Sequence, residues 1–151
     1  MNLSELTMYE ACVLHSRAER VLKSIVSSHL EVWKLTRMEW LVLATLGTRD
    51  NRHQGLTMTE VAEVLDVTLP QLNALTSKLI AMNYMKQTQS GSDKRIKVLQ
   101  VTKTGHNAIT ALEKDMRNAM KEWLKDVKLH DINNYMHTLQ TLGFSDNKSA
   151  K

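Results

Sequence analysis

Two helix-start signals follow each other closely in the middle of the chain. The segments 57–60 (TMTE) and 68–71 (TLPQ) are capping boxes, in which a threonine hydroxyl and a Glu or Gln side chain each satisfy a free backbone amide. Only Asp66 and Val67 separate the two apolar-periodic runs, and Pro70 falls in a first helical turn, where its missing amide costs little. Two short helices joined by so tight a turn indicate a helix-turn-helix, whose second helix can enter a DNA major groove.

The second of these helices has two chemically different faces. Its apolar face, which we expect in the core, consists of Leu72, Leu75, Leu79 and Met82. Its outward face, which follows the capping residue Thr68, consists of Pro70, Gln71, Asn73, Ala74, Ser77, Lys78 and Ala81. Lys78 is the one charged side chain between Leu69 and Met82. Base recognition would therefore depend on Gln71 and Asn73, whose amides can bond an adenine edge at two points.

A β-hairpin is predicted directly after this helix. Asn83 tolerates the left-handed conformation of a helix end, and residues 85–88 and 95–101 are predicted strands on either side of a turn, 89–94 (QSGSDK). The hairpin and its flanks are basic, with one acid, Asp93, among Lys86, Lys94, Arg95, Lys97 and Lys103. A helix-turn-helix followed by such a hairpin is a winged helix, whose wing is expected to supply most of the attraction to phosphates.

Helices are also predicted before the winged helix. Residues 8–30 form one long amphipathic helix, whose apolar seam consists of Ala11, Leu14, Ala18, Val21 and Ile25. This seam is expected to pack against a second subunit in preference to the core of its own chain. A capping box at 36–39 (TRME) opens a short, almost wholly apolar helix, which we expect to be buried and to stop at a left-handed Gly47, before a loop over 48–55.

Two more apolar-periodic stretches fill the last third of the chain. The first begins near Lys103 and contains Ile109, Leu112, Met116, Ala119, Trp123 and Val127. The second ends at Gly143 and contains Ile132, Tyr135, Met136, Leu139 and Leu142. The predicted fold class is therefore mainly α with a small β-hairpin wing: a winged helix-turn-helix flanked by N- and C-terminal helices.

Composition limits the class of protein. At 151 residues, with 42% hydrophobic and 24% charged residues, the chain fits one globular domain, 1–151. A single cysteine, the lack of a basic, apolar leader in the first ten residues and the lack of a long apolar run favour a cytoplasmic protein that does not enter a membrane. A net charge of +4 leans modestly towards an anionic partner. No catalytic motif and no cofactor-binding motif is present, so we expect neither an enzyme nor a bound cofactor.

Taken in order, these residues resemble the MarR family of transcriptional regulators over almost the whole chain. The matching pieces are 36–43 (TRMEWLVL), 56–62 (LTMTEVA), the core positions of the predicted reading helix (Leu72, Leu75, Leu79), Asp93-x-Arg95 in the wing, and 101–105 (VTKTG). The order and spacing of these pieces are specific, although no single piece is.

The resemblance implies a fold, an assembly and a function. It implies an obligate homodimer with a winged helix at about 36–102, joined through helices at about 8–30 and 103–143, on a pseudo-palindromic double-stranded DNA site. It also implies a ligand crevice between the dimerisation helices and the winged helix. A Met-lined crevice would suit a small aromatic effector, and we expect a repressor that the effector releases.

Two departures from the family pattern shift the expected DNA contacts. Ala74 stands where many relatives have a basic residue, and Asn83 replaces the usual glycine. The resemblance places Arg95 in or near the minor groove, with Asp93 bracing the hairpin. The DNA-binding residues predicted are Thr68, Pro70, Gln71, Asn73, Ala74, Ser77, Lys78, Lys94, Arg95 and Lys97.

Alternatives to this interpretation stay open. The same fold could hold a protein partner instead of DNA. The position of Cys12 also resembles that of the reactive cysteine in the organic-peroxide-sensing branch of the family, which admits a thiol-based sensor or, less readily, a peroxide-consuming enzyme. The tyrosines of those sensors are replaced here by Ser16, Val26 and Arg37, so a buried, inert thiol is the commoner expectation. The histidines show no ligand spacing for zinc, and no metal site is predicted.

Overall fold

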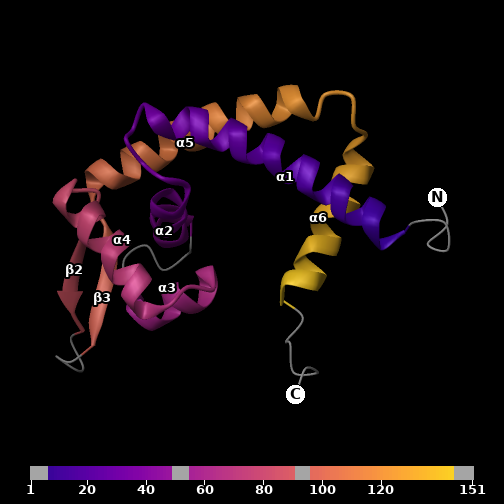
Figure 1. Ribbon diagram of the computed structural model, residues 1–151. Helices are drawn as coiled ribbons and strands as arrows, with labels where there is room; N and C mark the ends of the chain where they lie inside the picture. Colours follow the sequence, from indigo (N-terminus) through magenta and orange to yellow (C-terminus); the bar gives the residue numbers. More distant parts are fainter. Residues whose placement is uncertain (1–6, 49–54, 91–95, 145–151) are drawn as a thin grey trace, which may run out of the picture. The chain divides into compact units, whose positions relative to one another are not determined.

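The computed structural model describes residues 7–48, 55–90 and 96–144 (Figure 1). The chain divides into two compact units, residues 1–117 and 118–151. The described elements, in chain order, are α1 (Met8–Glu31), α2 (Arg37–Thr48), β1 (Leu56–Thr57), α3 (Met58–Leu65), α4 (Leu69–Ala81), β2 (Met85–Gln89), β3 (Lys97–Val101), α5 (Lys103–Trp123) and α6 (Leu129–Phe144).

The core of the first unit is built around α2, which contacts α1, α3, α4 and β3. Val42 and Leu43 of this helix are completely buried, as its nearly continuous apolar sequence predicts. Leu72 and Leu79 of α4 enter the same core, and α5 adds Leu112. The expectation that the helix after the capping box at 36–39 is buried is therefore confirmed.

Gly47 does not end α2 in a left-handed turn, and this prediction was wrong. The helix continues to Thr48, and Gly47 is buried inside it. A Cβ atom at Gly47 would lie 2.7 Å from Cδ1 of Ile109 on α5. A side chain at position 47 would therefore force Ile109 to move, and this contact between α2 and α5 is invisible in the local sequence.

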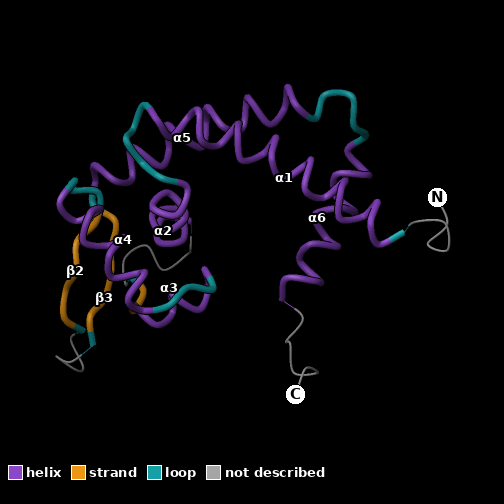
Figure 2. Tube along the Cα trace, viewed as in Figure 1, coloured by secondary structure: helices purple, strands orange, loops and turns teal. Residues whose placement is uncertain are grey.

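The sheet has three antiparallel strands in the order β1-β3-β2. The hairpin is confirmed, with Met85 opposite Val101 and Gln89 opposite Lys97 (Figure 2). Three details differ from the prediction: β2 extends to Gln89, β3 begins at Lys97, and the two-residue strand β1 adds Leu56 opposite Leu99. A strand this short carries too little pattern to be recognised, and its second residue doubles as the cap of α3.

The start of α5 is fixed against the end of the reading helix. The Thr102 hydroxyl accepts a hydrogen bond from the Gly105 amide at 3.1 Å and donates one to the Asn83 carbonyl at 2.7 Å. A Cβ atom on Gly105 would meet the Tyr84 carbonyl oxygen, so only glycine allows this packing. This explains the Thr-x-x-Gly pattern after the wing.

The terminal helices bury little of their apolar surface. Of α1, only Val26 and Leu30 are buried, although the helix runs as predicted and gains a further capping box at Thr7 and Glu10. In the second unit, α6 leaves Tyr135, Met136 and Leu139 exposed. The predicted periodicity through Val127 was wrong, because α5 ends at Trp123 and residues 124–128 connect it to α6.

Candidate nucleic-acid interface

The helix-turn-helix is closed by the two predicted capping boxes. Thr57 Oγ1 accepts from the Glu60 amide at 3.2 Å while Glu60 accepts from the Thr57 amide at 2.7 Å, and Thr68 and Gln71 repeat the arrangement. Asp66 adopts the left-handed conformation at φ 52° and ends α3, so the chain reverses within three residues before α4 begins. Figure 2 shows α3, this turn and α4 next to the β2–β3 hairpin.

The two faces of α4 are arranged as predicted. Leu72 and Leu79 are fully buried, and Leu75 and Met82 pack against the core. The predicted outward positions are all exposed: Pro70, Gln71, Asn73, Ala74, Ser77, Lys78 and Ala81. Leu69 and Ile80 are exposed as well, which the two-face pattern did not predict. Sequence periodicity missed the buried Thr76, whose hydroxyl is satisfied by donating to the Asn73 carbonyl at 3.1 Å.

Gln71 and Asn73 differ in how much of each side chain is available. Gln71 Oε1 accepts hydrogen bonds from the amide and the hydroxyl of Thr68, both at 3.0 Å, so its carbonyl serves the capping box. Within the described segments, the Asn73 side-chain amide makes no hydrogen bond; only its backbone carbonyl accepts, including 2.8 Å from Ser77. Asn73 is therefore the better placed of the two for bidentate contact with a base.

Lys78 points back towards α2 and is bound there. Its ammonium lies 2.9 Å from each oxygen of the Glu39 carboxylate and 3.4 Å from the carbonyl of Lys34, which has φ 54°. The Glu39 side chain is 6% exposed, against 47% for Lys78. Sequence reasoning recognised Glu39 as a capping residue but could not detect a partner on another helix, because no local periodicity links the two positions.

Burial, Thr36 and Lys78 together determine the ionisation of Glu39. Burial raises the pKa of this carboxyl group, but hydrogen bonds from the Thr36 amide, at 2.8 Å, and from the Lys78 ammonium lower it by more. The net result is a pKa below the ordinary value of 4.5. The carboxylate is therefore ionised near neutral pH although it is buried, and its charge is compensated by Lys78.

The wing presents basic side chains on its described strands. Lys86 of β2 and Lys97 of β3 are both exposed. Lys97 is paired in register with Gln89 at the end of the hairpin nearest its turn. The predicted wing residues Asp93, Lys94 and Arg95 lie outside the described residues.

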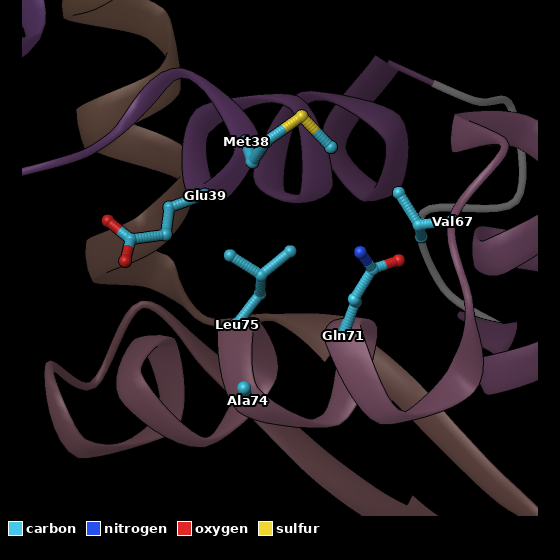
Figure 3. A pocket seen from close by; sticks show the side chains of 6 residues that line it. All are labelled: Met38, Glu39, Val67, Gln71, Ala74 and Leu75. Carbon is cyan, nitrogen blue, oxygen red and sulfur yellow. The ribbon is translucent and has the colours of Figure 1, made fainter.

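A cavity of about 540 Å³ lies between α2 and the first half of α4. Its lining residues are Met38, Glu39, Val67, Gln71, Ala74 and Leu75. Figure 3 shows the side chains of Gln71 and Leu75 pointing from α4 towards α2. This cavity belongs to the winged helix itself, since none of its lining residues comes from α1, α5 or α6.

Cys12 is exposed on α1, so the expectation of a buried thiol was wrong for the single chain. At the positions where peroxide sensors of the family have tyrosines, Val26 is buried in the core and Arg37 faces Glu19 at 3.9 Å. No hydroxyl network therefore forms from these two residues. Among the described residues, no group of three His, Cys, Asp or Glu side chains is gathered as a metal site requires.

Comparison with known proteins places this geometry in a family. The sequence model of the MarR family matches residues 33–96, which contain α2, the helix-turn-helix and most of the wing. The segment that contains the winged helix is therefore similar to the MarR family. No functionally curated protein matches the chain in sequence.

Solved MarR-type structures share the fold over nearly the full chain. CouR from Rhodococcus jostii RHA1, solved with p-coumaroyl-CoA, is 18% identical with a TM-score of 0.79, covering 97% of both chains. Staphylococcus aureus MepR, solved with DNA, is 18% identical (TM-score 0.75; 91% of this chain and 97% of MepR). Escherichia coli MarR is 15% identical (TM-score 0.70; 91% and 97%). At these identities the likeness establishes the MarR fold, a winged helix between N- and C-terminal helices.

The described helices were also compared with the length and hydrophobicity of a membrane span. None is both long and apolar enough to cross a bilayer.

Proposed function

We propose that this protein is a cytoplasmic, homodimeric regulator of transcription that binds a pseudo-palindromic site in double-stranded DNA. The observation that carries the proposal is the exposed polar face of α4. This face follows the tight turn of a helix-turn-helix and stands beside a hairpin with exposed Lys86 and Lys97. Helices exposed in this way enter the major groove, while basic wings attract the phosphates.

Sequence readout is assigned to the first two turns of α4. Asn73 reads an adenine edge, and the Ala74 methyl group suits contact with a thymine methyl group. Thr68, Pro70, Gln71 and Ser77 complete the surface that faces the groove, with Gln71 contributing its amide nitrogen because its carbonyl is held by Thr68. The wing residues Lys94, Arg95 and Lys97 supply phosphate and minor-groove contacts, and Asp93 braces the hairpin.

Dimerisation is assigned to the apolar surface that one protomer leaves uncovered. On α1, Leu14 is 54% exposed and Val21 is 42% exposed, both within the predicted seam. On α6, Tyr135 and Met136 are each 51% exposed and share one face with Leu139. Large apolar side chains clustered on a helix face mark association surfaces, and a two-fold dimer presents two reading helices to successive major grooves.

Regulation is assigned to a small aromatic effector that favours a spacing of the two reading helices unsuited to DNA. MepR has been solved with DNA and CouR with p-coumaroyl-CoA, so this fold accommodates both kinds of ligand. An effector shifts the population only by its preference for the DNA-incompetent form. We assign the protein the role of a repressor that this effector releases from DNA.

Selection of bound sequences from random duplex DNA tests the proposal. A two-fold-symmetric consensus, bound with an affinity that falls steeply as salt is added, is the expected result. A winged helix that holds only a protein partner would yield no enriched sequence and no salt-dependent duplex binding.

A further inference from the structure

The side chain of Lys78 is committed to a buried carboxylate on another helix. It contributes the one charge on α4, yet its ammonium sits between the two Glu39 oxygens, 2.9 Å from each. The Lys34 carbonyl, turned by a left-handed residue at the end of α1, is the next acceptor at 3.4 Å. Lys78 therefore joins α4 to the N-terminal turn of α2 and to the segment before it.

Glu39 is bound on its other side as well. It accepts the Thr36 amide at 2.8 Å and occupies the first turn of α2, where the helix dipole favours a negative charge. A buried carboxylate held in this way has a fixed position, so the ammonium bound to it is fixed too. Removal of Lys78 would leave the charge of Glu39 uncompensated at a site that water hardly reaches.

The pair acts on the part of α4 that is assigned to base readout. Ser77 precedes Lys78 in the chain, and Ala74 lies one helical turn before it. Rotation of α4 about its axis would move these groups and Asn73 together, and the Glu39–Lys78 pair ties the same helix to α2. The ion pair adds a short polar contact between α4 and α2 to the apolar packing of Leu72 and Leu79.

We propose that Glu39 and Lys78 are a positioning pair that sets the orientation of the reading helix, and that Lys78 acts through Glu39 and does not contact a phosphate. This inference rests on the proposed DNA-binding function and deepens it. It removes Lys78 from the set of DNA contacts predicted from sequence and adds Glu39, a residue that cannot reach DNA itself because it is buried.

A double-mutant cycle on DNA binding tests the inference. Lys78→Met removes the ammonium but keeps an apolar stem, and Glu39→Gln removes the charge but keeps an acceptor for the Thr36 amide. We expect each single variant to bind the selected duplex about tenfold more weakly, with an unchanged salt slope. In the Glu39→Gln background, Lys78→Met should change affinity by less than about threefold, because the two residues act as one unit. Lys78→Arg, which can bond both carboxylate oxygens, should stay within about threefold of the wild type.

Matched measurements separate this role from two others. Lys97→Met on the wing is the control for a phosphate contact and should lower the salt slope by about 0.9. If Lys78→Met lowers the slope by the same amount in both backgrounds, Lys78 is a phosphate contact and the inference is overturned. If both variants bind like the wild type while they are fully folded, the pair serves stability alone and the inference is again overturned.

The same four proteins of the cycle are also compared by urea unfolding without DNA. This measurement distinguishes failure of the positioning role from failure of the proposed DNA binding. A positioning pair predicts coupling in the folding equilibrium constant of at least about fivefold. Additive variants would contradict the pair even if DNA binding is found. Strong coupling in a protein that binds no duplex would leave the ion pair intact and remove its assigned role together with the proposed function.

Discussion

The reading helix α4 and the terminal helix α6 treat their apolar faces in opposite ways. In α4, Leu72 and Leu79 are completely buried by the same chain, and the exposed residues are mostly polar or small, with Leu69 and Ile80 as the apolar exceptions. In α6, Tyr135, Met136 and Leu139 remain exposed although they share one helix face. The winged helix thus completes its core within one protomer, whereas α6 does not. In the dimer proposed above, the winged helix can therefore be rigid on its own, whereas α6 depends on association to cover its apolar face.

The largest expected effect is a loss of stability when the core of the winged helix is disrupted. Leu79→Ala removes a completely buried side chain of α4 and should lower the free energy of unfolding by about 3 kcal/mol. Ile80→Ala is the matched control on the same helix, because Ile80 is 39% exposed, and should cost less than about 1 kcal/mol. Urea unfolding at fixed protein concentration measures both. Equal costs would show that α4 is not packed as described.

The second prediction concerns the apolar face of α6 and the dimer proposed to form through it. Tyr135→Glu together with Leu139→Glu places two charges on the apolar face of α6, and the dissociation constant of the dimer should rise about 100-fold or more. By helical spacing, His137→Glu adds a charge on the opposite face of α6. This control should change the dissociation constant of the dimer little. Sedimentation equilibrium distinguishes the outcomes. A dimer unaffected by the double variant would place the interface elsewhere.

The third prediction divides DNA binding between the two parts of the winged helix. Asn73→Ala should cost about 1–3 kcal/mol at one base pair of the selected site and relax the preference there. Arg95→Ala should weaken binding to all duplexes about equally and reduce the salt slope by about 1. Titrations of single-base variants of the site at several salt concentrations check both. If neither variant shows its effect, the assignment of α4 and the wing to DNA is wrong.

Local chemistry explains why so much of α4 could be predicted. Its capping residues, its core positions Leu72 and Leu79 and its exposed face are all encoded within one or two turns of sequence. The left-handed Asn83, at φ 59°, and the hairpin that follows are equally local. These features need no knowledge of the rest of the fold.

Two of the features that sequence missed depend on contacts between distant segments. Gly47 is a residue type that commonly ends a helix, yet α2 continues past it. Gly47 is buried there, next to Ile109 of α5. Lys78 is a residue type that commonly contacts phosphates, yet its ammonium is paired with the carboxylate of Glu39. Gln71 shows a milder case, since the capping box that was recognised uses the carbonyl that a bidentate contact with adenine would need. For Gly47 and Lys78 a contact with a distant segment decided the outcome, whereas for Gln71 it was a local hydrogen bond.

The smallest expected effect is the loss of stability at acid pH that follows from protonation of Glu39, the partner of Lys78 on α4. Burial raises the pKa of Glu39, but the hydrogen bonds from Thr36 and Lys78 lower it below 4.5 in the folded protein. The unfolded chain therefore takes up this proton at higher pH than the folded chain, and the stability that Glu39 contributes is present above about pH 4.5 and lost as the pH falls through the folded value. Glu39→Gln cannot lose stability in this way, so the difference in unfolding free energy between wild type and variant should shrink between pH 6 and pH 3.5. Urea midpoints across this range measure the difference, and one that stays constant would mean that Glu39 is not held as an anion by Lys78.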